Sequence, residues 1–189
     1  SAIGIMGGLI GACFNGANER LTHWRLKHVN HSKYRRFLEV MIVSSVMSFL
    51  SFTIPLFWTE CTPIPDESLL PESSYKEFLI PFTCKKGEEY NQVASLLFNE
   101  ASAAIRLLFH MHFSAFDSRA LLLFFLPYIC MASIVYGMAV PSGLFVPSLL
   151  SGAAFGRLFG KLVLKIHPSG RYASGNTYSL IGAASVLGG

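Results

Sequence analysis

Charged residues are scarce in this sequence. Only 14% of its 189 residues are Asp, Glu, Lys or Arg, whereas a soluble domain has about 25%. The hydrophobic fraction is 52% and the mean hydropathy is +0.46. This composition excludes an ordinary soluble domain and predicts an integral membrane protein.

Motifs for metal binding, catalysis and nucleic-acid recognition are also lacking. No Cys-x-x-Cys or Cys/His spacing indicates zinc, and His110 and His112 would lie on different faces of a helix. No Ser/His/Asp arrangement or phosphate-binding loop is present. The net charge of +4 comes without a basic helix that carries base-reading residues. We therefore expect no enzyme activity, no metal, no cofactor and no nucleic-acid partner.

The sequence has no initiator methionine, and no basic segment precedes its first apolar stretch, so a signal peptide is not expected. It begins within "SAIGIMGGLIGACF" and ends within "YSLIGAASVLGG". We expect an internal piece of a longer chain.

Four segments carry no charge over a length relevant to a membrane span, which needs about 20 residues. They are residues 1–18, 40–59, 120–156 and 172–189. Pro141 divides the third segment, because proline removes a backbone N–H and clashes with the preceding turn. The sequence thus predicts membrane helices at 1–18, 40–59 and 120–140, a half-helix at 141–166 and the start of another helix at 172–189.

The polar connections have opposite charge. Residues 19–39 contain six basic residues and two acidic ones, which predicts a cytoplasmic basic loop. For that reason the formal glycosylation sequon at Asn30 is expected to carry no glycan. Residues 60–100 contain eight acidic residues and three lysines, and we expect a lumenal acidic loop at 60–90, followed by partly immersed helices at 91–119.

Two cysteines, Cys61 and Cys84, lie in the acidic segment. A disulfide between them is expected if this segment faces an oxidising compartment.

Small residues recur at intervals of four in two regions. The glycine pairs are Gly4/Gly8, Gly7/Gly11, Gly152/Gly156 and Gly156/Gly160. Such spacing lets membrane helices approach closely. It is compatible both with packing inside one subunit and with a contact between subunits.

The stretch "VPSGLFVPSLLSG" interrupts an apolar segment with two prolines and a Ser-Gly pair. Broken backbone inside a membrane is tolerated only where it is buried in protein or lines a wet cavity. If a helix starts at Gly143, the free amides of Gly143, Leu144 and Phe145 and the positive end of the helix dipole form an anion site. Pro147 costs little in a first turn. The alternative is a proline-kinked packing helix.

Four stretches resemble one family. "SGLFVPSLLSGAAFGRLFG" closely resembles the G-[IL]-F-x-P motif of the CLC chloride channels and proton-coupled chloride exchangers. "GGLIGACFNGANERL" resembles the preceding G-x-x-G-x-x-F-N helix, and "YSLIGAASVLGG" resembles the helix after the anion motif. "EYNQVASLLFN" resembles a stretch of the intracellular exchanger branch, and "VPSGLFVPSLL" with "GAAFGRL" resembles the endosomal and lysosomal exchangers rather than plasma-membrane channels.

This resemblance implies an all-α membrane fold of two inverted repeats, of which this chain is a fragment, in a homodimer with one anion pathway per subunit. It implies that the backbone amides of Leu144 and Phe145 bind chloride, with Gly143, Val146 and Pro147 completing the motif. The implied function is voltage-dependent chloride transport, as a chloride/proton antiporter, across an endosomal, lysosomal or vacuolar membrane, and an accessory subunit on the lumenal side is a further implied partner.

The family's G-S-G-x-P loop and its G-R/K-E-G-P loop with the gating glutamate do not occur in this sequence. The choice of exchanger and of chloride over nitrate therefore follows from branch similarity. The alternatives are a chloride channel of the same fold and a membrane scaffold that does not transport.

Overall fold

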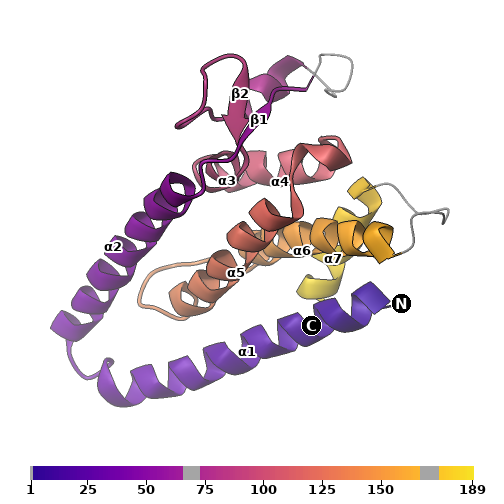
Figure 1. Cartoon of the computed structure of the whole chain (residues 1–189). Coiled ribbons are helices and arrows are strands. Elements are labelled where there is room, and N and C mark those ends of the chain that lie inside the picture. The colour runs from indigo at the N-terminus through magenta and orange to yellow at the C-terminus, as the bar shows by residue number, and fades with distance from the viewer. Residues whose placement is uncertain (1, 66–72, 167–174) are drawn as a thin grey trace.

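Two long helices frame the molecule. The computed structural model describes residues 2–65, 73–166 and 175–189. Helices α1 (Ala2–His28) and α2 (Lys33–Phe57) meet at a sharp turn and open like a V (Figure 1). Between them lie α5 (Ser118–Val135), α6 (Phe145–Ile166) and α7 (Gly175–Leu187). At the far end of α2 are strands β1 (Cys61–Pro63) and β2 (Glu89–Asn91), helices α3 (Gln92–Leu97) and α4 (Ala101–His110), and short 3-10 helices η2 (Ser73–Phe78) and η3 (Phe113–Ala115).

The basic segment predicted as a loop at 19–39 is almost entirely helical, which corrects that prediction. Neither proline nor glycine interrupts the end of α1, and its last turn carries Arg25, Lys27 and His28, which favour a helix C-terminus. Only the turn after His28 connects α1 to α2. Arg35 donates to the carbonyl of His28 at 2.9 Å, so basic side chains cap this turn.

Among the residues that the structure describes, two helices are long and apolar enough to cross a membrane, α2 and α5. They cover most of the predicted spans 40–59 and 120–140, but α5 ends at Val135. Pro127 lies inside α5 without ending it. Only 6% of the most apolar window of α2 is buried. The surface of α2 is therefore free to contact lipid or other parts of a longer protein.

Residues 60–90, predicted as a loop, contain an antiparallel pair of short strands. Cys61 pairs with Asn91 in this ladder, and Cys61 and Cys84 form a disulfide. Asn91 is fully buried. Its Nδ2 donates to the carbonyl of Trp58 at 2.9 Å, and its Oδ1 accepts the amides of Val93 and Ala94. One side chain thus caps the end of α2 and the start of α3, because both helix ends have unpaired backbone groups.

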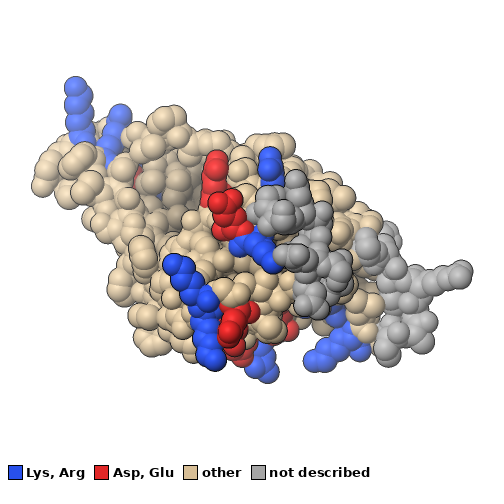
Figure 2. All heavy atoms as spheres, turned by 90° about the horizontal axis from the view of Figure 1, so that it is seen from above, with Lys and Arg blue, Asp and Glu red and all other residues tan. Residues whose placement is uncertain are grey.

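The end of the molecule that carries β1 and β2 contains acidic and basic side chains together, and much of the rest of the surface in that view is uncharged (Figure 2). Asp66, Glu67 and Glu72, which contribute to the acidity of the predicted lumenal loop, lie outside the described residues. The described residues alone therefore present a mixed surface at this end.

Helix α6 packs on α7 through glycines. A Cβ added to Gly156 of α6 would lie 2.1 Å from the carbonyl oxygen of Tyr178 in α7. Helix α1 packs on α7 in the same way, because a Cβ added to Gly7 would lie 2.0 Å from the Oγ of Ser185. Gly152 and Gly11 are also crowded: an added Cβ would lie 2.7 Å from the Cα of Ala183 and 2.8 Å from the carbonyl carbon of Gly189, respectively. Of the two explanations for the glycine pairs, packing inside one subunit or contact between subunits, the first therefore applies to these four glycines. Gly4, in contrast, has no described atom within 4 Å of an added Cβ.

Arg157 anchors α6 to the segment that joins α4 and η3. Its side chain is fully buried, and its Nη2 donates to the carbonyls of Met111 and His112. Its guanidinium also lies 5.6 Å from the centre of the Phe116 ring. Beside it, burial raises the pKa of the Tyr90 hydroxyl, which stays protonated and donates to the carbonyl of Ala115. These contacts fix the body of α6 against α4 and η3.

Candidate anion site

The break after α5 separates two helices by a short irregular segment. Helix α5 ends at Val135, and Gly137 has a φ of +84°, a left-handed conformation that glycine adopts without steric cost. Helix α6 begins at Phe145. The half-helix predicted from residue 141 therefore starts four residues later, since residues 141–143 form no regular secondary structure.

The first turn of α6 leaves donors without helical partners. The first backbone hydrogen bond runs from the amide of Ser148 to the carbonyl of Leu144 at 3.1 Å, so the amide of Phe145 has no acceptor within the helix. The amide of Leu144 lies directly before it. Pro147, at the third helical position, has no amide to satisfy. The positive end of the helix dipole coincides with these donors.

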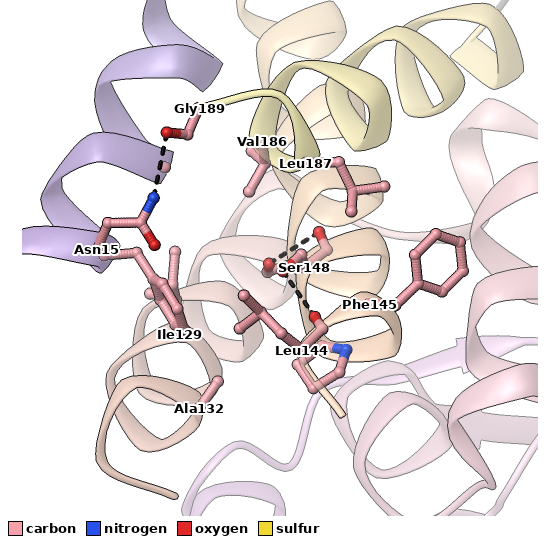
Figure 3. Close-up of a pocket in the computed structure, with 13 residues that line it drawn as sticks. Asn15, Ile129, Ala132, Leu144, Phe145, Ser148, Val186, Leu187 and Gly189 are labelled. Atoms are coloured by element: carbon pink, nitrogen blue, oxygen red, sulfur yellow. Dashed lines mark hydrogen bonds between the residues drawn. The ribbon is translucent and has the colours of Figure 1, made fainter. Parts of the chain in front are cut away.

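A cavity of about 230 Å³ adjoins this helix start. Its walls come from the three consecutive helices α5, α6 and α7 and from α1, which is distant in sequence. These walls include Asn15 from α1, Ile129 from α5, Phe145 from α6 and Leu187 from α7 (Figure 3). Most of the lining is apolar, and a small number of polar groups converge on it, which is typical of a small-ligand site.

The cavity contains part of the predicted motif. Leu144, Phe145 and Pro147 line it, whereas Gly143 and Val146 do not. The Phe145 ring is directed away from Ile129 and Ala132 in Figure 3, and 64% of this residue is exposed. A Cβ added to Gly143 would meet no described atom within 4 Å. The space beside Gly143, directly before Leu144 in the chain, is therefore open.

Three polar residues of the cavity were not predicted from the sequence. The Oγ of Ser148 donates to the carbonyl of Leu144 at 2.7 Å, and the Nδ2 of Asn15 donates to the carbonyl of Gly189 at 3.2 Å (Figure 3). Ser151 lines the same wall. Ser148 follows Leu144 by four positions, the spacing at which a serine bonds back to a helix carbonyl. This spacing of four is the sequence feature from which the hydrogen bond of Ser148 could have been predicted.

The whole chain matches a described protein family. Residues 1–189 match the family described as "Voltage gated chloride channel". Chloride channel protein CLC-d of Arabidopsis thaliana is 36% identical over 198 residues, which cover 100% of this chain and 25% of that protein. The human H(+)/Cl(-) exchange transporter 7 is 34% identical over 188 residues, covering 100% and 22%. Chloride channel protein CLC-c of Arabidopsis thaliana is 36% identical over 193 residues, covering 99% and 24%. The chain thus spans about a quarter of the length of the relatives it matches.

Proposed function

This chain belongs to the voltage-gated chloride channel family, and from that premise we propose that it forms the chloride-binding part of a chloride/proton exchanger of an intracellular membrane. Members of the family are channels and exchange transporters, not enzymes. The substrate ion is chloride, bound by the backbone amides of Leu144 and Phe145 where α6 begins. Gly143, Val146 and Pro147 shape that helix start.

The observation that carries this proposal is the helix start beside the cavity. A full positive charge buried in a membrane is costly, and it would hold an anion tightly. Backbone amides and a helix dipole supply a weaker attraction. Conduction requires binding that is favourable and still weak enough for the ion to leave. A half-helix N-terminus meets both requirements, and transporters use this device near the membrane midplane.

Exchange rather than passive conduction is proposed from the relatives. One of them is named as an H(+)/Cl(-) exchange transporter and two as chloride channel proteins. The two alternatives are a channel of the same fold and a scaffold that does not transport. Both differ from the exchanger in lacking coupled proton flux, and they differ from each other in chloride flux. Chloride-driven proton uptake into liposomes that contain the full-length protein supports the exchanger. Chloride flux without proton movement would indicate a channel, and no flux would indicate a scaffold.

The orientation in the membrane is proposed from charge and disulfide chemistry. The basic residues at the α1–α2 turn favour the cytoplasmic side. The Cys61–Cys84 disulfide lies at the opposite end of α2, and disulfides persist in oxidising compartments. We therefore assign the β1–β2 end to the lumen of an endosomal, lysosomal or vacuolar membrane. A homodimer, voltage dependence and a lumenal accessory subunit belong to the same proposal.

The anion site is tested by removing one amide at a time. Leu144→Pro removes an assigned amide and should abolish chloride binding, measured by calorimetry on the full-length protein. Leu144→Ala keeps the amide and should bind chloride almost normally. Gly143→Val should weaken binding because its side chain occupies the open space directly before Leu144. Ser142→Pro is the matched control, since it removes an unassigned amide from the same irregular segment.

Size-exclusion chromatography and liposome flux accompany each variant. A folded Leu144→Pro protein that binds and moves chloride normally would show that this half-helix serves packing alone.

A further inference from the structure

We propose that Asn18 and Arg25 of α1, together with Glu39 of α2, are positioning residues for the anion site because they hold the C-terminal end of α5. This inference rests on the proposed function. It assigns a role to three residues that do not line the cavity.

The two α1 side chains bind backbone carbonyls of α5. The Nδ2 of Asn18 donates to the carbonyls of Ser133 at 3.1 Å and of Tyr136 at 2.9 Å. The Nη1 of Arg25 donates to the carbonyl of Tyr136 at 3.0 Å, and its Nη2 donates to the carbonyl of Ile134. The last carbonyls of a helix have no partner within the helix. Three carbonyls in and directly after α5, those of Ser133, Ile134 and Tyr136, thus accept hydrogen bonds from side chains of α1.

Glu39 completes the arrangement from α2. Its Oε1 lies 2.5 Å from the Nε of Arg25. Arg25 is 4% exposed, and a buried guanidinium requires a charged or hydrogen-bonded partner. All three nitrogens of Arg25 are therefore engaged, one with the carboxylate and two with α5. The rigid planar shape of the guanidinium suits such a set of contacts better than an ammonium group would.

We call Asn18, Arg25 and Glu39 together the clamp. The chain between the clamp and the anion site has few other restraints. Gly137, directly after the clamped carbonyls, faces α1: an added Cβ would lie 3.2 Å from the Oγ1 of Thr22. Within the described residues, residues 139–143 make no backbone or side-chain hydrogen bond. The path of this segment is therefore set by its two ends, the clamp and the start of α6.

The body of α6 is held independently by α7 and by the Arg157 contacts. Release of the clamp should accordingly leave α6 packed and displace the segment that carries Gly143 and the amide of Leu144. The expected consequence is weaker anion binding in a protein that still folds. A residue important for folding alone would instead reduce the yield of folded protein and leave the chloride affinity of that protein unchanged.

The test uses full-length protein and calorimetric titration with chloride. Arg25→Gln removes the charge and the fork of donors, and Arg25→Lys keeps the charge but loses the planar fork. We expect chloride binding about tenfold weaker for both, as when about a tenth of the molecules keep the competent arrangement. Glu39→Gln, which leaves the carbonyl contacts in place, should weaken binding less. Arg20→Gln and Glu19→Gln change exposed residues of the same helix and should bind as the wild type does.

The outcomes separate this inference from the proposed function. If Leu144→Pro abolishes chloride binding while folded Arg25→Gln, Arg25→Lys and Glu39→Gln bind as the wild type does, the clamp proposal is wrong and the anion site stands. If Leu144→Pro has no effect, the proposed site itself is wrong. Should Arg25→Gln fail to fold, Arg25→Lys and Glu39→Gln decide the matter by the same measurement.

Discussion

Gly137 offers a sharp test of how the end of α5 controls the anion site. Its φ of +84° is in the left-handed region, where a residue with a Cβ costs about 1–2 kcal/mol. In Gly137→Ala the new methyl group would also lie 3.2 Å from the Oγ1 of Thr22 and 3.5 Å from the Nη1 of Arg25. The first contact is tight, so the methyl group should displace Thr22, whose hydroxyl donates to the Oδ1 of Asn18. Asn18 is one of the two side chains that hold the carbonyl of Tyr136.

Gly87 provides the matched control. Its φ is +89°, and an added Cβ would meet no described atom within 4 Å. Gly87→Ala therefore introduces the same backbone strain without crowding, and it does so at the β1–β2 end. Both variants should lower thermal stability by a similar amount, corresponding to about 1–2 kcal/mol.

Only Gly137→Ala should weaken chloride binding. A bias of about 1–2 kcal/mol against the native path of the segment lowers the competent population and the apparent affinity by a factor of up to about 5 to 30. Calorimetric titration of both purified full-length variants measures this difference, and thermal unfolding in detergent measures the strain. Equal chloride affinities for a destabilised Gly137→Ala and for Gly87→Ala would refute the reasoning.

Two further predictions concern the parts of the fold that surround the site. Cys61→Ser opens a loop with a sequence separation of 23 and should destabilise the β1–β2 end by about 3 kcal/mol on the chain-entropy estimate. Limited proteolysis of this end checks the loss, and two free thiols in freshly isolated wild-type protein, found by thiol labelling and mass spectrometry, would contradict the disulfide. Gly156→Ala places a methyl group 2.1 Å from the Tyr178 carbonyl and should destabilise the α6–α7 contact by about 1–3 kcal/mol. Gly16→Ala is the control, because a Cβ added there has no described neighbour. It should be neutral or stabilise the protein by up to about 1 kcal/mol. Equal melting temperatures for Gly156→Ala and Gly16→Ala would argue against the packing described for α6 and α7.

The sequence by itself determined those features that depend on composition and local backbone chemistry. The scarcity of charge indicated a membrane protein, and the family resemblance is confirmed by the match over residues 1–189. Pro141 and Pro147 indicated a break in the long apolar segment because proline restricts the backbone wherever it occurs. The break is present, although α6 starts at Phe145 and the basic segment is helical. Helix ends were misplaced because charged residues after a membrane span extend a helix as readily as they form a loop.

Only the tertiary structure decided which surfaces meet. The walls of the cavity come from α1, α5, α6 and α7, and no sequence spacing relates Asn15 to Leu187. Arg25 contacts a carbonyl 109 positions away, and its partner has no side-chain signature because every residue carries the same backbone acceptor. For the same reason the sequence could indicate that Gly156 allows close approach, but not that the approaching group is the backbone of Tyr178.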